Sequence, residues 1–157
     1  MTAKGSTRRG YAYPGAMALV LCSLVAAAFM AGVGWLVSVV QYPGFALVGE
    51  DAWAAYHDAH RRRITYVVLP AMVAELTSAA WIALDPPAFV DPRAAWAGLA
   101  LAAGSWALTF LAAVPDHDRL AGGYDRVVGS RLTRLHHLRT ACWTLHALLA
   151  CTLVAAA

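Results

Sequence analysis

Long apolar runs separated by short polar stretches dominate the chain. An α-helix needs about 20 mostly apolar residues to cross the hydrocarbon core of a bilayer. Four runs reach that length, and they lie at residues 16–40, 64–84, 94–114 and 135–156. Residues 1–15 form a polar N-terminal tail, and residues 16–157 read as a single transmembrane domain. The pattern predicts an all-α membrane protein, a four-transmembrane-helix up-down bundle with short links.

Proline and glycine mark where these helices are expected to end. The Gln41-Tyr42-Pro43-Gly44 segment is predicted to end the first span and Asp85-Pro86-Pro87 the second. Pro92 lies near the favoured first-turn position of the third span, and Pro115 is predicted to end it. Residues 116–134 then predict a polar connector.

The segment between the first two spans has a mixed character. Phe45 to His60 combines aromatic residues with acidic ones, which predicts a short interfacial helix between spans 1 and 2. Pro70 lies inside the second span and predicts a kink, which membrane helices tolerate.

Composition supports a membrane protein and excludes several classes. Of the 157 residues, 61% are hydrophobic and 13% are charged, which is more apolar surface than a soluble domain of this length buries. A net charge of +3 with scattered basic residues does not indicate a nucleic-acid partner. The three cysteines form no CxxC pair, which argues against a dithiol redox enzyme. We therefore expect a multi-pass protein whose first partner is the lipid bilayer.

Basic residues bear on the orientation of the bundle. The connectors at 41–63 and 115–134 carry more arginine than the opposite side, so the positive-inside rule favours these connectors in the cytoplasm. The basic N-terminal tail favours the reverse orientation, so both remain open.

Polar side chains gather at the bundle end that carries these two connectors. Five of the six histidines belong to this group. The group consists of His57, His60, His117, His136, His137, Gln41, Tyr42, Tyr56 and Arg139. Bundle topology brings them to one mouth, and this convergence is the main functional signal in the chain.

The last helix extends this polar group into the membrane. Its polar residues recur so as to share one helical face, which should point to the bundle interior. They are His136, Arg139, Thr140, Trp143 and His146. Glu75 lies at a similar depth in the second span as His146, and we predict that the two side chains approach each other or meet through a water. The sequence then predicts a polar shaft from mid-membrane to the mouth, lined by Glu75, His146, Trp143, Thr140, Arg139 and His60.

Several of these residues have more than one interpretation. His57 and His60 could be interfacial residues without a ligand, ligands of a metal or haem, or contacts to substrate or proton. Arg139 could extend to the surface or bind an anionic group, and Glu75 could be purely structural. No spacing equals a known metal signature such as HExxH, so metal and cofactor stay unknown.

Several short motifs stand out along the chain: Gln41-Tyr42-Pro43 with Phe45, Tyr56-His57 with His60, Pro70 with Met72 and Glu75, and His137-x-Arg139-Thr140 with Trp143. Together they resemble a family of small four-helix bacterial membrane proteins of largely unknown function, related to the anthrone-oxygenase-like proteins of polyketide pathways. The last helix of those oxygenases carries an Asn-His-x-Arg-Thr pattern; here His136 stands at the asparagine position.

The resemblance implies a bacterial inner-membrane location and an oxygenase-like reaction on a small aromatic polyketide. It implies His137 or His60 as base, Arg139 as the group that stabilises an enolate, and Glu75 with His146 as a proton relay. Substrate contacts are expected from Gln41, Tyr42, Tyr56, His57, His136, Thr140 and Trp143.

Three functions follow. The first is a membrane-embedded oxidoreductase or oxygenase-like enzyme of biosynthesis, acting on a small lipophilic molecule. The second is a non-catalytic membrane subunit or small-molecule carrier, with another membrane protein or a second copy as partner. The third is a haem-binding electron carrier that uses His60 with His136 or His137 as axial ligands.

Overall fold

The computed structural model describes residues 13–157, so most of the predicted polar tail, residues 1–12, lies outside the described residues. The described part is helical and contains no β-strand. Its elements are α1 (Tyr13–Leu36), η1 (Val37–Gln41), α2 (Tyr42–Phe45), α3 (Glu50–Leu84), α4 (Pro92–Leu108), η2 (Thr109–Ala113), α5 (Val114–Arg119) and α6 (Arg126–Ala155).

Four helical stretches of residues 13–157 are long and apolar enough to cross a membrane. They are Pro14–Phe45, Glu50–Leu84, Pro92–Arg119 and Arg126–Ala155. The predicted all-α bundle of four membrane-length helices is confirmed, and it indicates a membrane protein.

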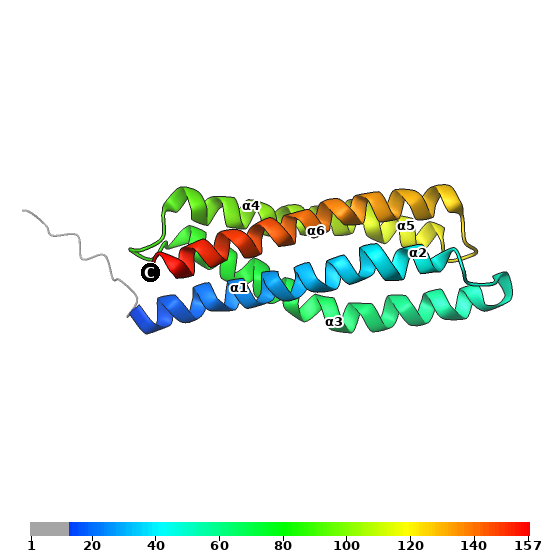
Figure 1. The fold of residues 1–157 in the computed structure, drawn as a ribbon, viewed down its shortest axis with the longest axis horizontal. Helices are drawn as coiled ribbons and strands as arrows, with labels where there is room; N and C mark the ends of the chain where they lie inside the picture. Colours follow the sequence, from blue (N-terminus) through cyan, green and yellow to red (C-terminus); the bar gives the residue numbers. More distant parts are fainter. Residues whose placement is uncertain (1–12) are drawn as a thin grey trace, which may run out of the picture.

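The long helices run side by side (Figure 1). α1 packs against α3 and α6, and α4 packs against the same two helices. α1 begins and α6 ends at one end of the bundle, whereas α2 and α5 lie at the opposite end. We call this opposite end the polar end, because it contains most of the buried histidines.

Large apolar side chains cover the outside of the bundle. Leu36, Leu111 and Leu148 are 61%, 78% and 59% exposed. In water such a surface would drive aggregation, whereas in a bilayer it contacts lipid chains that are as apolar as leucine.

The helices at the polar end are longer than the sequence predicted. Residues 50–60 are the first turns of α3, so the predicted short interfacial helix over residues 45–60 is not a separate element. No proline or glycine lies between Glu50 and Pro70, so a change from polar to apolar residues did not end the helix. The predicted connector at 116–134 is likewise mostly helical, since α5 continues to Arg119 and α6 begins at Arg126.

Two prolines that were predicted to end helices lie inside continuous helical segments. Pro43 follows η1 and Pro115 follows η2, and each occupies the first turn of the next helix. Proline lacks an N–H group and crowds the preceding turn of an α-helix. The wider π turn before each proline, closed by N–H to C=O bonds from Tyr42 to Val37 and from Val114 to Thr109, lets the chain continue.

Aspartates position the ends of three helices. The side chains of Asp91 and Asp125 accept hydrogen bonds from the first-turn N–H groups of α4 and α6, respectively. Asp116 of α5 is fully buried and pairs with Arg119 at 2.8 Å and with Arg131 of α6 at 3.4 Å. These contacts hold α5 against the start of α6.

The interior alternates between apolar and polar layers. The apolar layer at the polar end contains Val37, Tyr42, Phe45, Trp53, Ala113, Leu120 and Leu132. A middle layer consists of Met30, Met72 and Trp143. The layer at the opposite end contains Val20, Ile82, Ala83, Val90 and Ala95. Polar side chains of α6 lie between these layers, with His136 and Arg139 before Trp143 and His146 after it.

Candidate functional site

A pocket of about 160 Å³ lies inside the polar end, between the first two apolar layers. Its walls come from all four membrane-length segments. The lining residues are Met30, Val33, Gly34, Val37, Tyr42, Arg61, Ile64, Thr65, Val68, Thr109, Ala113, Val114, His117, His136, Arg139 and Trp143. We call it the Arg139 pocket.

Arg139 is a buried cation without an acidic partner. Its side chain comes from α6, and the residue is only 6% exposed. Nη1 lies 3.3 Å from His136 Nδ1, and the guanidinium carbon lies 4.9 Å from the centre of the Trp143 ring. Within residues 13–157 no carboxylate pairs with Arg139, and its Nε has no hydrogen-bond partner. Arg139 therefore points inward to the pocket rather than extending to the surface.

His136 is fixed by contacts at both ring nitrogens. Nε2 lies 3.2 Å from the backbone oxygen of Gly34, and a carbonyl can only accept, so Nε2 carries the proton and donates. Nδ1 then accepts from Arg139. In this arrangement His136 is a neutral imidazole whose basic nitrogen lies next to the cation.

A chain of hydrogen bonds links two histidines and a tyrosine beside the pocket. His57 Nε2 lies 3.1 Å from His117 Nδ1, and His117 Nε2 lies 3.1 Å from the Tyr42 hydroxyl. The Tyr42 ring packs against His136, with centroids 4.9 Å apart. His57 is 1% exposed and stacks on Trp53, so it is a buried residue rather than an interfacial one.

The two π turns place two members of this chain, Tyr42 at one end and His117 in the middle. Tyr42 immediately follows η1, and His117 is the fourth residue of α5, which follows η2. Each wide turn allows a proline within two residues of the functional side chain while the helix continues. The sequence placed His117 in the histidine group at this end of the bundle but assigned it no role in the site.

Gln41, Tyr56 and His60 lie in a separate pocket at the polar end. This second pocket measures about 360 Å³ and also includes Ala59, Arg63, Ile64 and Val67. Gln41 Nε2 donates to the Tyr56 hydroxyl at 2.6 Å. His60 packs its ring against Tyr42, Phe45 and His117 without lining the Arg139 pocket.

His137 lies away from both pockets. Its side chain is exposed, its Nδ1 bonds the backbone oxygen of Thr133 at 2.8 Å, and its ring packs beside Trp35. The motif that carries the family resemblance is therefore split between two faces of α6. Arg139 and Thr140 are buried, whereas His137 points outward.

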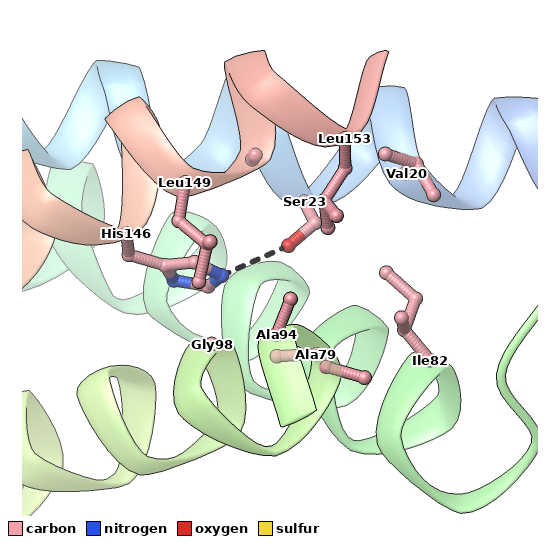
Figure 2. A pocket seen from close by; sticks show the side chains of 11 residues that line it. Val20, Ser23, Ala79, Ile82, Ala94, Gly98, His146, Leu149 and Leu153 are labelled. Carbon is pink, nitrogen blue, oxygen red and sulfur yellow. Dashed lines mark hydrogen bonds between the residues drawn. The ribbon is translucent and has the colours of Figure 1, made fainter. Parts of the chain in front are cut away.

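Glu75 and His146 meet, as predicted. His146 Nδ1 donates to Glu75 Oε1 at 2.7 Å. On the other side of the ring, His146 Nε2 lies 3.2 Å from the Ser23 hydroxyl, as Figure 2 shows. Exposure is 0% for Glu75, 3% for His146 and 2% for Ser23. Ser23 carried no signal in the sequence, because a single serine in an apolar run is common.

Because Gly98 has no side chain, α4 can lie close to His146. A Cβ atom on Gly98 would lie 3.3 Å from His146 Nε2. Beside the imidazole is a small cavity of about 10 Å³, lined mostly by aliphatic side chains such as Val20, Ile82 and Leu153 (Figure 2). That volume has room for about one water molecule.

The structure has separate cavities in place of the predicted continuous shaft. The Arg139 pocket and the cavity beside His146 share no lining residue, and His60 lines a third pocket. Met30, Met72 and Trp143 form a buried apolar cluster in the same part of the bundle. Thr140 lines neither the Arg139 pocket nor the cavity beside His146. Its hydroxyl donates to the His136 carbonyl oxygen at 3.0 Å. Side chains that share one helical face reached different layers because neighbouring helices fill the space between them.

Within residues 13–157, no group of three or more His, Cys, Asp or Glu side chains is arranged to hold a metal ion. Comparison with models of known protein families, with curated proteins and with solved structures found no match. The geometry of the Arg139 pocket is therefore the main basis for a functional proposal.

Proposed function

We propose that the chain is a membrane-embedded enzyme that removes a proton from a small, lipophilic, weakly acidic substrate in the Arg139 pocket. The observation that supports this most directly is the buried guanidinium of Arg139, which has no carboxylate partner among the described residues. A buried charge is costly unless it is compensated, and in membrane helices such residues are usually functional. An anion formed on a bound substrate would compensate it.

His136 is the base in this proposal. Its Nδ1 accepts a hydrogen bond from Arg139 Nη1 at 3.3 Å. In this proposal the Arg139 N–H turns to the substrate oxygen, which frees the Nδ1 lone pair to take the proton and leaves the resulting anion next to the guanidinium. A fixed cation beside the developing charge lowers the barrier to deprotonation. His136 takes the role that the family resemblance gave to His137, whose side chain lies outside the pocket.

The hydrogen-bonded chain through His57, His117 and Tyr42 supports the next step. Each imidazole can accept a proton at one nitrogen and release it at the other. The chain begins at the Tyr42 hydroxyl, whose ring packs on His136, and leads to His57 near the start of α3. No hydrogen bond joins His136 to the Tyr42 hydroxyl among the described residues, so in this proposal the bound substrate connects the two and the chain then carries the proton away from the site.

An oxygenase-like reaction would follow from the same intermediate. A carbanion stabilised next to an aromatic or carbonyl group can react with dioxygen, and the overall change is CH₂ + O₂ → C=O + H₂O. The resemblance to anthrone-oxygenase-like proteins suggests this outcome. The part of it that the pocket supports is the first step, deprotonation.

Hydrogen–deuterium exchange tests deprotonation without knowledge of the oxidant. Protein in lipid nanodiscs in D₂O would be incubated with a panel of cyclic diketones and anthrone-type C–H acids, and deuterium uptake measured by mass spectrometry. General base catalysis contributes about 10²–10⁴-fold, so His136→Ala and Arg139→Gln should each lower the exchange rate by at least about tenfold. His137→Ala is the matched control and should exchange like the wild type.

Two results would overturn the proposal. One is exchange no faster than in empty nanodiscs for every compound in the panel. The other is exchange that His136→Ala leaves unchanged while the variant remains folded. Tight binding of a compound without exchange would instead favour the non-catalytic subunit or carrier.

A further inference from the structure

Two buried N–H groups of the Arg139 pocket lack acceptors. They are Nε of Arg139 and Nε1 of Trp143, in residues that are 6% and 1% exposed. The two side chains are neighbours, with the guanidinium carbon 4.9 Å from the indole centre. Buried donors without acceptors are uncommon in folded proteins and cost free energy. Both residues line the pocket, so a bound acceptor oxygen would satisfy them.

The charge of the pocket indicates how many negative charges a ligand should carry. Arg61 also lines the pocket, but its guanidinium pairs with Asp118 at 2.7 Å. His136 is bonded as a neutral imidazole. Arg139 therefore leaves one positive charge without a counter-ion in the described walls, which matches a monoanion.

The size and walls of the pocket restrict the rest of the ligand. Its volume of about 160 Å³ is close to the roughly 150 Å³ of an engineered apolar cavity that binds benzene. Met30, Val33, Val37 and Val68 supply apolar walls. One aromatic ring with a small substituent fits this space, whereas three fused rings do not fit unless the helices move apart.

We propose that the Arg139 pocket binds a single-ring aromatic monoanion, a carboxylate or phenolate, with its charged oxygen between the Arg139 guanidinium and the Trp143 indole N–H. The ring lies against the apolar walls. This inference rests on the proposed function in one respect: the monoanion is the form that a neutral single-ring phenol takes when it loses its proton in the same pocket, and a ring carboxylate carries the same charge. It narrows the substrate from the larger polyketide that the family resemblance implied to one ring.

Equilibrium dialysis with radiolabelled benzoate tests the inference. Wild-type protein in nanodiscs would be dialysed against benzoate, with empty nanodiscs subtracted for partition into lipid. Two competitors separate charge from size. Benzyl alcohol has a similar size but no charge, and anthracene-9-carboxylate has the same carboxylate attached to three fused rings. We expect benzoate to bind, benzyl alcohol to compete at least about tenfold more weakly, and the three-ring acid not to compete.

Two variants locate the binding site. Arg139→Gln should weaken benzoate binding by at least about tenfold, and Trp143→Phe, which keeps a ring but removes the N–H, by a smaller factor of about two to tenfold. Arg93→Gln is the matched control, because Arg93 is exposed at the opposite end of the bundle, and its affinity should equal that of the wild type.

Four results would overturn the inference. Absence of benzoate binding to the wild type, equal competition by benzyl alcohol, or competition by the three-ring acid as strong as that by benzoate would each overturn the inference. So would unchanged affinity in folded Arg139→Gln protein. The wild-type competition series remains decisive if a variant does not fold. Benzoate binding in a protein without exchange activity would refute the proposed enzyme while leaving this inference standing.

Discussion

Replacing His146 by leucine should expose the energetic role of the buried pair in the middle of the bundle. In the described part of the chain, His146 is the only hydrogen-bond partner of the Glu75 carboxyl group, and the other carboxyl oxygen has none. The substitution would therefore leave a fully buried acid without a partner. The same reasoning applies to Glu75→Leu, which leaves a buried imidazole that retains only Ser23.

The expected loss of unfolding free energy depends on whether the unfolded chain lies in water or in a bilayer. Breaking a buried ion pair in a soluble protein costs about 3–5 kcal/mol, because the remaining charge is not compensated. In a bilayer, the separated helices also find polar partners, and measured side-chain hydrogen bonds average about 0.6 kcal/mol with a maximum near 1.7. The hydrogen bond between His146 and Glu75 is short and involves a carboxyl group, so its contribution should lie between the maximum found in membranes and the lower end of the soluble-protein range. We therefore expect each single variant to lose about 2 kcal/mol of unfolding free energy.

A double-mutant cycle measures this pair directly. The free energy of unfolding would be obtained for the wild type, His146→Leu, Glu75→Leu and the double variant by titration with sodium dodecyl sulfate in mixed micelles. The double variant should be more stable than the sum of the single losses predicts, because it removes both polar groups. Leu148→Ala, on the exposed face of α6, is the control and should change stability by no more than about 0.5 kcal/mol. A coupling energy below about 0.5 kcal/mol would refute the reasoning.

Two further predictions concern packing at the polar end. Gly34→Ala should lower the free energy of unfolding by about 1–3 kcal/mol, because the new Cβ would lie 2.8 Å from the Thr140 hydroxyl, whereas Gly32→Ala, with no atom within 4 Å, should be neutral. Equal stabilities of the two glycine variants would contradict this packing argument. Asp116→Ala should cost about 1 kcal/mol in thermal unfolding, a modest value because its two arginine partners are half-exposed and regain water. A wild-type melting temperature in that variant would show that the aspartate does not stabilise α5.

The sequence predicted the membrane-length helices well because a bilayer imposes a simple length requirement on apolar runs. It misplaced the helix ends at the polar end, where the deciding feature is backbone geometry. Pro43 and Pro115 were interpreted as helix ends, but each is preceded by a π turn that lets the helix continue. Whether a proline ends a helix or follows a wide turn depends on the packing of the surrounding helices, which the sequence pattern does not contain.

The sequence also predicted the contact between Glu75 and His146, because depth along a membrane helix follows from residue number and two buried polar groups at the same depth should pair. Only the tertiary structure decided that the cavity beside His146 and the Arg139 pocket are separate, with no lining residue in common. Periodicity assigns a residue to a helical face, but it does not say which side chains from neighbouring helices occupy the space in front of that face. That filling of space, set by the contacts of all four helices together, turned one predicted shaft into two polar sites.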